Sequence, residues 1–164
     1  MPDNPSVVDA AITKVRKYFD TGKTKTYQFR KDQLTALKNG MVALAKDFDE
    51  ALTKDLGKGS FENWLCELNM LNAEVEHAIS HLSEWMKTES RDTPFTIGPG
   101  TSYIVREPLG VVAILGSWNY PLVTSISPLI SAIAAGNTAV FKPSEFSPHV
   151  TMICKRLFVR YLDS

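Results

Sequence analysis

The first half of the chain carries apolar residues three or four positions apart, the spacing that gathers them on one face of an α-helix. This pattern predicts three helices. The first ends before Gly22 and has apolar positions at Val8, Ala11, Ile12, Val15 and Phe19. The second covers residues 29–56, is followed by Gly57, and has its stripe at Leu34, Leu37, Met41, Leu44, Phe48 and Leu52. The third has its stripe at Phe61, Trp64, Leu65, Leu68, Leu71, Val75, Ile79, Leu82 and Met86.

The second half of the chain changes to shorter elements. Residues 91–100 are rich in Pro, Thr and Gly and predict a connection, after which TSYIVRE alternates polar and apolar residues like a half-exposed strand. Two apolar runs, at residues 111–115 and 138–141, predict buried strands, the first of them covered on both faces. Between them, residues 122–133 show an apolar helical face with Pro128 inside it. Ser147 and Pro148 predict the N-cap and first turn of a last helix that ends near Leu162.

Strand, helix, strand, helix is the order of two βα units, and such units form parallel sheets. A sheet of this kind has roughly five strands, so only part of one is present. The fold class predicted is therefore α/β: amino-terminal helices followed by the first βαβα part of a parallel sheet, incomplete as given.

Charge is distributed unevenly, because no Asp, Glu, Lys, Arg or His occurs from Pro108 to Phe141, and we expect this stretch to be buried. The 18 Lys and Arg residues balance 18 Asp and Glu residues, which excludes the basic surface that nucleic acid needs. No run approaches the ~20 apolar residues of a membrane span, and the start lacks the apolar core of a signal peptide. We expect a cytoplasmic protein without a nucleic-acid partner.

Asn119 lies in the segment SWNYP, just after the first buried strand, where open α/β sheets place their ligand crevices. A side-chain amide is neutral and keeps its protons at any working pH, so Asn119 could donate to an oxyanion. The alternative is that Asn119 only caps the following helix, with Pro121 in its first turn.

Lys142 and Glu145 lie at the end of the second strand, in FKPSE. A Lys donor and a Glu acceptor at this spacing can hold a ribose diol. The alternative is an exposed ion pair of little energetic weight. Neither strand is followed by GxGxxG or by GxxxxGK[ST], so any nucleotide must be held without those loops.

His77 and His81 are four residues apart, and Glu74 precedes His77 at the spacing of a di-iron motif. Both histidines fall about 200° from the apolar stripe, so a solvated face is expected and no metal site. Cys66 and Cys154 have no CxxC or Cys/His ligand spacing and fall inside predicted helices. We expect buried, unreactive thiols in a reducing compartment.

SWNYP followed by AAGNTAVFKPSE resembles the aldehyde dehydrogenase superfamily, whose members share a WN[YF]P turn, an AAGN helix end and a strand that ends in KPSE. FDTGKTKTYQFRKDQLTALK, KDLGKG, HLSEWM and SYIVREPLGVV resemble its class 3, fatty-aldehyde branch in particular. The resemblance implies a Rossmann-like sheet that binds NAD or NADP. It implies a helical region over residues 1–92, a connection and edge strand over 93–110, and the first part of a coenzyme-binding domain over 111–164.

The resemblance also implies roles for individual residues. Asn119 would be the oxyanion-hole side chain, and Lys142 and Glu145 would bind the adenosine ribose. The cofactor channel would be lined by Ile114, Leu115, Gly116, Ser117 and Trp118. The substrate side would be lined by Tyr120 and Leu122.

Catalysis in this family also needs a cysteine nucleophile and a glutamate that activates water, and both belong to later motifs that this chain lacks. The implied function is the amino-terminal part of an oxidoreductase that converts fatty or aromatic aldehydes to carboxylic acids. The full-length protein would be a homodimer, and any membrane association would come from residues beyond this chain. We expect the chain alone to be inactive. The alternatives are a short non-catalytic form that acts as a binding or interaction protein, and a metal-binding helical module.

Overall fold

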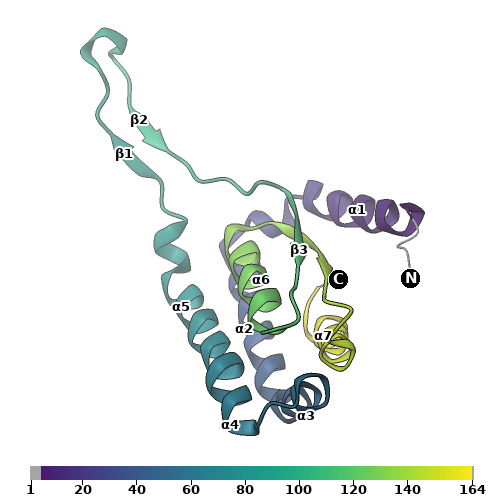
Figure 1. Cartoon of the computed structure of the whole chain (residues 1–164). Helices are drawn as coiled ribbons and strands as arrows, with labels where there is room; N and C mark the ends of the chain where they lie inside the picture. Colours follow the sequence, from purple (N-terminus) through teal and green to yellow (C-terminus); the bar gives the residue numbers. More distant parts are fainter. Residues whose placement is uncertain (1–4, 164) are drawn as a thin grey trace.

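The structure is a computed structural model that describes residues 5–163. Helices come first, a small hairpin follows, and two strands alternate with two helices at the end of the chain (Figure 1). The elements are α1 (Pro5–Asp20), α2 (Tyr27–Ala43), α3 (Ala45–Leu56), α4 (Ser60–Asn63), α5 (Asn69–Trp85), β1 (Glu89–Arg91), β2 (Ser102–Ile104), β3 (Val111–Leu115), α6 (Val123–Ala135), β4 (Thr138–Lys142) and α7 (Pro148–Tyr161).

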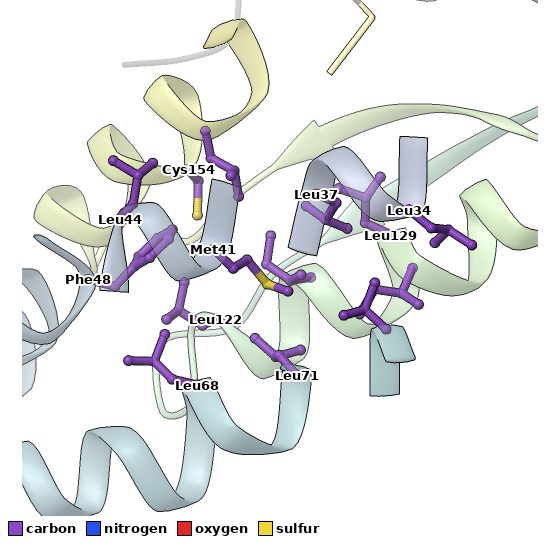
Figure 2. Close-up of a cluster of buried hydrophobic side chains, with 14 of the residues drawn as sticks. Leu34, Leu37, Met41, Leu44, Phe48, Leu68, Leu71, Leu122, Leu129 and Cys154 are labelled. Carbon is purple, nitrogen blue, oxygen red and sulfur yellow. The ribbon is translucent and has the colours of Figure 1, made fainter. Parts of the chain in front are cut away.

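The hydrophobic core lies mainly between helices, and β3 contributes Ile114 to it. Helix α2 packs against α5, α6 and α7, and α3 packs against α7. Figure 2 shows side chains from all of these helices meeting in one cluster, which includes Leu37, Met41, Phe48, Leu71 and Cys154. Full burial of one such side chain contributes about 1.5–3 kcal/mol, so the predicted apolar stripes are what join the helices.

The helix predicted over residues 29–56 is two helices. α2 ends at Ala43 and α3 begins at Ala45, with Leu44 between them at φ −103° and ψ 10°. Leu44 remains buried, and its N–H still donates to Gly40 O. The apolar period is therefore unbroken across the kink, which explains why the sequence pattern does not reveal it.

The third predicted helix is interrupted by a π-helical turn at Trp64–Leu68, where the N–H of Asn69 donates to Trp64 O, five residues back. A π turn adds a residue and rotates the preceding part by roughly 100° relative to a continuous α-helix. Consequently Phe61, Trp64 and Leu65 are exposed, not buried as their spacing predicted. The stripe from Leu68 onward does face the core.

Strands β3 and β4 pair in parallel, from Val111 opposite Thr138 to Leu115 opposite Lys142. This pairing and the α6 crossover confirm the predicted α/β class, and the sheet is incomplete. The prediction that β3 is covered on both faces is wrong for the described residues, because Leu115 is 72% exposed. An apolar sequence shows that a strand is suited to burial, but it does not show that other elements cover the strand. In the described residues only β4 pairs with β3.

A hairpin of β1 and β2 separates the helices from β3 and projects away from them in Figure 1. The half-exposed strand predicted within residues 101–107 corresponds to β2. Its partner β1 has the sequence Glu-Ser-Arg, which contains no apolar residue and therefore shows no strand pattern.

Helix α7 begins at Pro148, as predicted, but the Ser147 side chain makes no capping hydrogen bond. The carboxylate of Asp55, at the end of α3, caps this helix instead. It accepts hydrogen bonds from the N–H groups of His149 at 3.2 Å and Val150 at 2.8 Å.

Candidate functional site

Two turns lie together where β3 and β4 end. The Asn119 turn, residues 116–122, follows β3, and the Lys142 turn, residues 142–147, follows β4. Parallel pairing brings both to the same edge of the sheet, and Gly116 N–H donates to Lys142 O at 3.0 Å. The rings of Trp118 and Phe146 meet edge to face, with centroids 6.0 Å apart. The structure thus brings together residues that lie more than twenty positions apart.

Gly116 marks a tight passage at the start of the Asn119 turn. A Cβ atom at Gly116 would lie 2.1 Å from the Oγ of the buried Ser125 in α6. A side chain at this position would therefore require the Ser125 hydroxyl to move. Of the residues that follow, Trp118, Asn119 and Tyr120 are exposed.

Asn119 is exposed, and its side chain does not cap α6. The Oδ1 atom accepts a hydrogen bond from Ser117 Oγ at 2.6 Å. Helix α6 begins four residues later, at Val123, and its first N–H groups are bonded to a different side chain. The helix-cap alternative for Asn119 is therefore wrong. Its amide NH2 has no protein partner among residues 5–163 and is left to donate to another molecule.

The residues expected to line a cofactor channel differ in accessibility. Leu115 is 72% exposed and Trp118 is 58% exposed, so both present apolar surface at the sheet edge. Gly116 and Ser117 are half-buried. Ile114 is buried in the core cluster, so its side chain presents no open surface.

Lys142 and Glu145 form an exposed ion pair, with 3.1 Å between Lys142 Nζ and Glu145 Oε2. The pKa of Glu145 lies below its ordinary value, chiefly because of its own backbone N–H and then because of Lys142. Glu145 is thus held ionised as an acceptor, while Lys142 has further N–H groups to donate. A vicinal diol needs this donor and acceptor set, so the pair fits a ribose.

The two residues expected on the substrate side are placed differently. Tyr120 is partly exposed at the end of the Asn119 turn. Leu122 is 1% exposed and packs in the core (Figure 2), so it lines no open surface among the described residues.

Two residues that the sequence pattern did not single out contact the Asn119 turn. Glu67, in the π turn, is fully buried, and its Oε2 accepts from Leu122 N–H at 2.8 Å and from Val123 N–H at 3.4 Å. Lys58 Nζ lies 3.3 Å from Glu67 Oε1 and donates to Asn119 O at 2.9 Å. The one sequence signal available was a carboxylate next to Leu68 in an apolar stripe.

The candidate metal ligands and the two cysteines lie away from the edge of the sheet where β3 and β4 end. His77 and His81 stack on the outer face of α5, with ring centroids 4.0 Å apart, which confirms that they lie away from the core. Glu74 points toward α6 and accepts from Ser127 Oγ at 2.7 Å. Cys154 is buried as predicted, whereas Cys66 is only half-buried because it lies in the π turn.

A hollow of about 570 Å³ lies between α1, α2 and β4, with Val15, Phe29 and Phe141 among its lining residues. Neither Asn119 nor Lys142 lines it, so this hollow is separate from the two turns. No helix in the described part of the chain has the length and apolar character that crossing a membrane requires.

Parallel strands with a helical crossover define an α/β protein, and in this one two polar turns gather at the carboxyl ends of the strands. The sequence model of the aldehyde dehydrogenase family matches residues 3–161. The chain therefore belongs to the aldehyde dehydrogenase family.

Relatives agree with the predicted branch. "Aldehyde dehydrogenase family 3 comG" of Dictyostelium discoideum is 42% identical over 149 residues, which cover 91% of this chain and 32% of that protein. "Aldehyde dehydrogenase, dimeric NADP-preferring" of Canis lupus familiaris is 38% identical over 158 residues, which cover 96% and 35%. A solved structure described as the substrate-bound state of Staphylococcus aureus AldH matches with a TM-score of 0.92 at 39% identity, covering 95% of this chain and 34% of that one. The chain spans about a third of the length of these relatives.

Proposed function

We propose that this chain is the amino-terminal part of an NAD(P)-dependent aldehyde dehydrogenase that oxidises fatty or aromatic aldehydes to carboxylic acids. The observation that carries the proposal is the register of β3 and β4, with Leu115 opposite Lys142. That register brings the amide of Asn119 and the Lys142–Glu145 pair to one edge of the sheet. Family membership supports the reaction class, and the name of the Canis lupus familiaris relative supports a nicotinamide coenzyme.

In the proposed reaction, Asn119 donates a hydrogen bond to the aldehyde oxygen. That oxygen gains negative charge when a nucleophile adds to the carbonyl carbon, and a fixed neutral donor stabilises the charge without moving a proton. Ser117 Oγ holds the other end of the amide, at Oδ1. The nucleophile itself is outside this chain, because neither Cys66 nor Cys154 matches the family's motif.

The coenzyme would lie along the exposed edge of the sheet. Lys142 donates to a ribose hydroxyl, and Glu145 accepts from its neighbour. Leu115 and Trp118 supply the apolar surface against which the flat rings pack, and Tyr120 faces the aldehyde side. Bound NAD or NADP would accept the hydride that leaves the aldehyde carbon.

For the whole protein we propose a cytoplasmic homodimer. The dimer is supported by the name of the Canis lupus familiaris relative. The location is supported by the two cysteines, which are both free thiols, as is usual in a reducing compartment.

The oxyanion role is tested in the longest native chain that contains these residues. Asn119→Ala should lower the chemical step by about 10²–10³-fold, because an oxyanion donor acts mainly in the transition state. Coenzyme affinity should stay nearly unchanged. Single-turnover rates of coenzyme reduction are the measurement, since product release often limits kcat. Asn119→Asp keeps the shape, has no N–H group, and should fail equally.

The ribose role is tested by titrating the coenzyme against Lys142→Ala. Loss of one charged hydrogen bond should weaken coenzyme binding about tenfold and leave the rate at saturating coenzyme nearly intact. Lys155→Ala, on the exposed face of α7, is the matched control and should change neither quantity. An unchanged chemical step in Asn119→Ala would refute the oxyanion role, and unchanged coenzyme affinity in Lys142→Ala would refute the ribose role.

A further inference from the structure

Lys58 links the amino-terminal helices to the Asn119 turn. It lies between α3 and α4, and its side chain is 13% exposed. Its Nζ donates to the backbone oxygen of Asn119 at 2.9 Å and lies 3.8 Å from the centroid of the Tyr120 ring. One ammonium group therefore contacts two consecutive residues of the turn.

Glu67 holds the other end of the same turn. Its carboxylate accepts from the N–H of Leu122 and Val123, where α6 begins, and from Lys58 through the second oxygen. The positive end of a helix dipole also favours a negative charge at this place. Burial raises the pKa of Glu67, while the N–H of Leu122 and the charge of Lys58 oppose that rise.

The turn has few other anchors. Within it, Ser117 N–H donates to Thr124 Oγ1 at 3.1 Å, and the Thr124 hydroxyl donates to Tyr120 O at 2.9 Å. These bonds close the turn on itself and on α6, and they do not fix it relative to α4 and α5. Apart from the packing of Leu122 in the core, the Lys58–Glu67 pair supplies that attachment. Glu67 lies in the π turn, and its side chain is buried there.

We propose that Lys58 and Glu67 are positioning residues that hold the backbone of the Asn119 turn and thereby aim the Asn119 amide at the reacting carbonyl oxygen. The proposal rests on the oxyanion role proposed above for Asn119. In this proposal both residues act through the turn and not through contact with substrate or coenzyme. A misplacement of about 1 Å in a donor can cost on the order of 10²-fold in rate, so a backbone anchor of this kind has a measurable effect.

The first test is Lys58→Met in the longest native chain, because methionine keeps a long apolar side chain and removes the donor. The single-turnover rate of coenzyme reduction should fall at least tenfold, while coenzyme affinity stays within twofold. Lys38→Met is the matched control, since Lys38 pairs with Glu76 at 2.7 Å between α2 and α5, away from the turn. That control should leave both quantities unchanged.

A double variant separates positioning from charge balance. Lys58→Met alone leaves the buried Glu67 carboxylate without its cation, whereas Lys58→Met with Glu67→Gln buries no unpaired charge and keeps an acceptor for Leu122 N–H. The rate should stay low in the double variant, because the bond to Asn119 O is still missing. Recovery to the wild-type rate would overturn the proposal. The double variant also serves if Lys58→Met alone does not fold.

Hydrogen exchange tests the placement without any catalysis. Lys58→Met should speed amide exchange in residues 117–124 relative to Lys38→Met, with the helices of the core unchanged. Unchanged exchange overturns the proposal, and so does faster exchange with an unchanged rate in an active enzyme. If the wild type reduces no coenzyme, the proposed function has failed, and the exchange result alone decides whether Lys58 holds the turn.

Discussion

At the scale of single residues, Gly136 shows how one missing side chain makes room for a buried charge. The guanidinium of Arg30 is almost fully buried and donates to the carbonyl oxygens of Thr24, Lys25 and Ala134. These bonds join the start of α2 to the end of α6. Gly136 ends α6 at φ +84°, and a Cβ atom there would lie 2.6 Å from the guanidinium.

Gly136→Ala should lower the free energy of unfolding by about 2–4 kcal/mol. A left-handed alanine costs about 1 kcal/mol, and displacing Arg30 leaves buried carbonyl groups without partners, at about 1–3 kcal/mol. Gly57→Ala is the matched control, because Gly57 also has a positive φ but a Cβ atom there meets nothing within 4 Å. It should cost about 1 kcal/mol. Urea unfolding measures both, and equal losses would contradict the Arg30 collision.

At the residue scale, the sequence predicted only those site residues that directly follow a predicted strand. Asn119, Lys142 and Glu145 come directly after buried strands, so their shared edge follows from the order of elements. Glu67 could not be predicted, because a single carboxylate inside an apolar helical pattern usually points to solvent. Its burial depends on partners 55 and 56 residues away along the chain, which local patterning does not report.

At the scale of elements, α3 and α7 are joined by a cap that crosses between them. Asp55, 1% exposed at the end of α3, accepts from the first N–H groups of α7 and contacts the His149 ring at 2.6 Å. The Ser147 hydroxyl, expected to do this, donates to Ser144 O at 3.4 Å instead. The same carboxylate therefore caps α7 and holds α7 against α3.

Asp55→Ala should destabilise the chain by about 1–2 kcal/mol, the usual effect of losing a helix cap. Asp47→Ala is the matched control, because Asp47 also joins α3 to α7, through an exposed ion pair with Arg156 at 2.5 Å. An exposed pair of this kind contributes at most about 1 kcal/mol. Thermal unfolding of both variants tests the difference. If Asp47→Ala lowers the stability as much as Asp55→Ala does, the cap contributes no more than the exposed ion pair.

Helices and strands were predicted correctly where the spacing of apolar residues stayed regular along the whole element. The β3–α6–β4–α7 order, and the buried stripes of α2, α3 and α5, follow from apolar spacing alone. The break at Leu44 and the π turn at Trp64–Leu68 could not be predicted, because each leaves apolar residues three or four apart. The apolar side chains at Phe61 and Trp64 therefore looked like core residues although they are exposed.

At the scale of the whole molecule, neither cysteine of this chain matches the nucleophile that the proposed reaction needs. Cys154 is buried and Cys66 is half-buried. Burial raises the pKa of Cys154 to about 12, so this thiol stays protonated at neutral pH. Cys66 lies inside a helical turn and matches no nucleophile motif. Under the proposed function, the attacking group would therefore be neither Cys66 nor Cys154.

The 164-residue chain alone should therefore oxidise no aldehyde. Purified chain with NAD or NADP and a medium-chain or aromatic aldehyde should give no coenzyme reduction above a protein-free control, measured by absorbance. The longest native chain under the same conditions is the positive control. Turnover by the short chain that disappears in Cys66→Ser or Cys154→Ser would show that one of these thiols attacks the carbonyl. That result would favour an independent catalyst over a part that needs the rest of its family's fold.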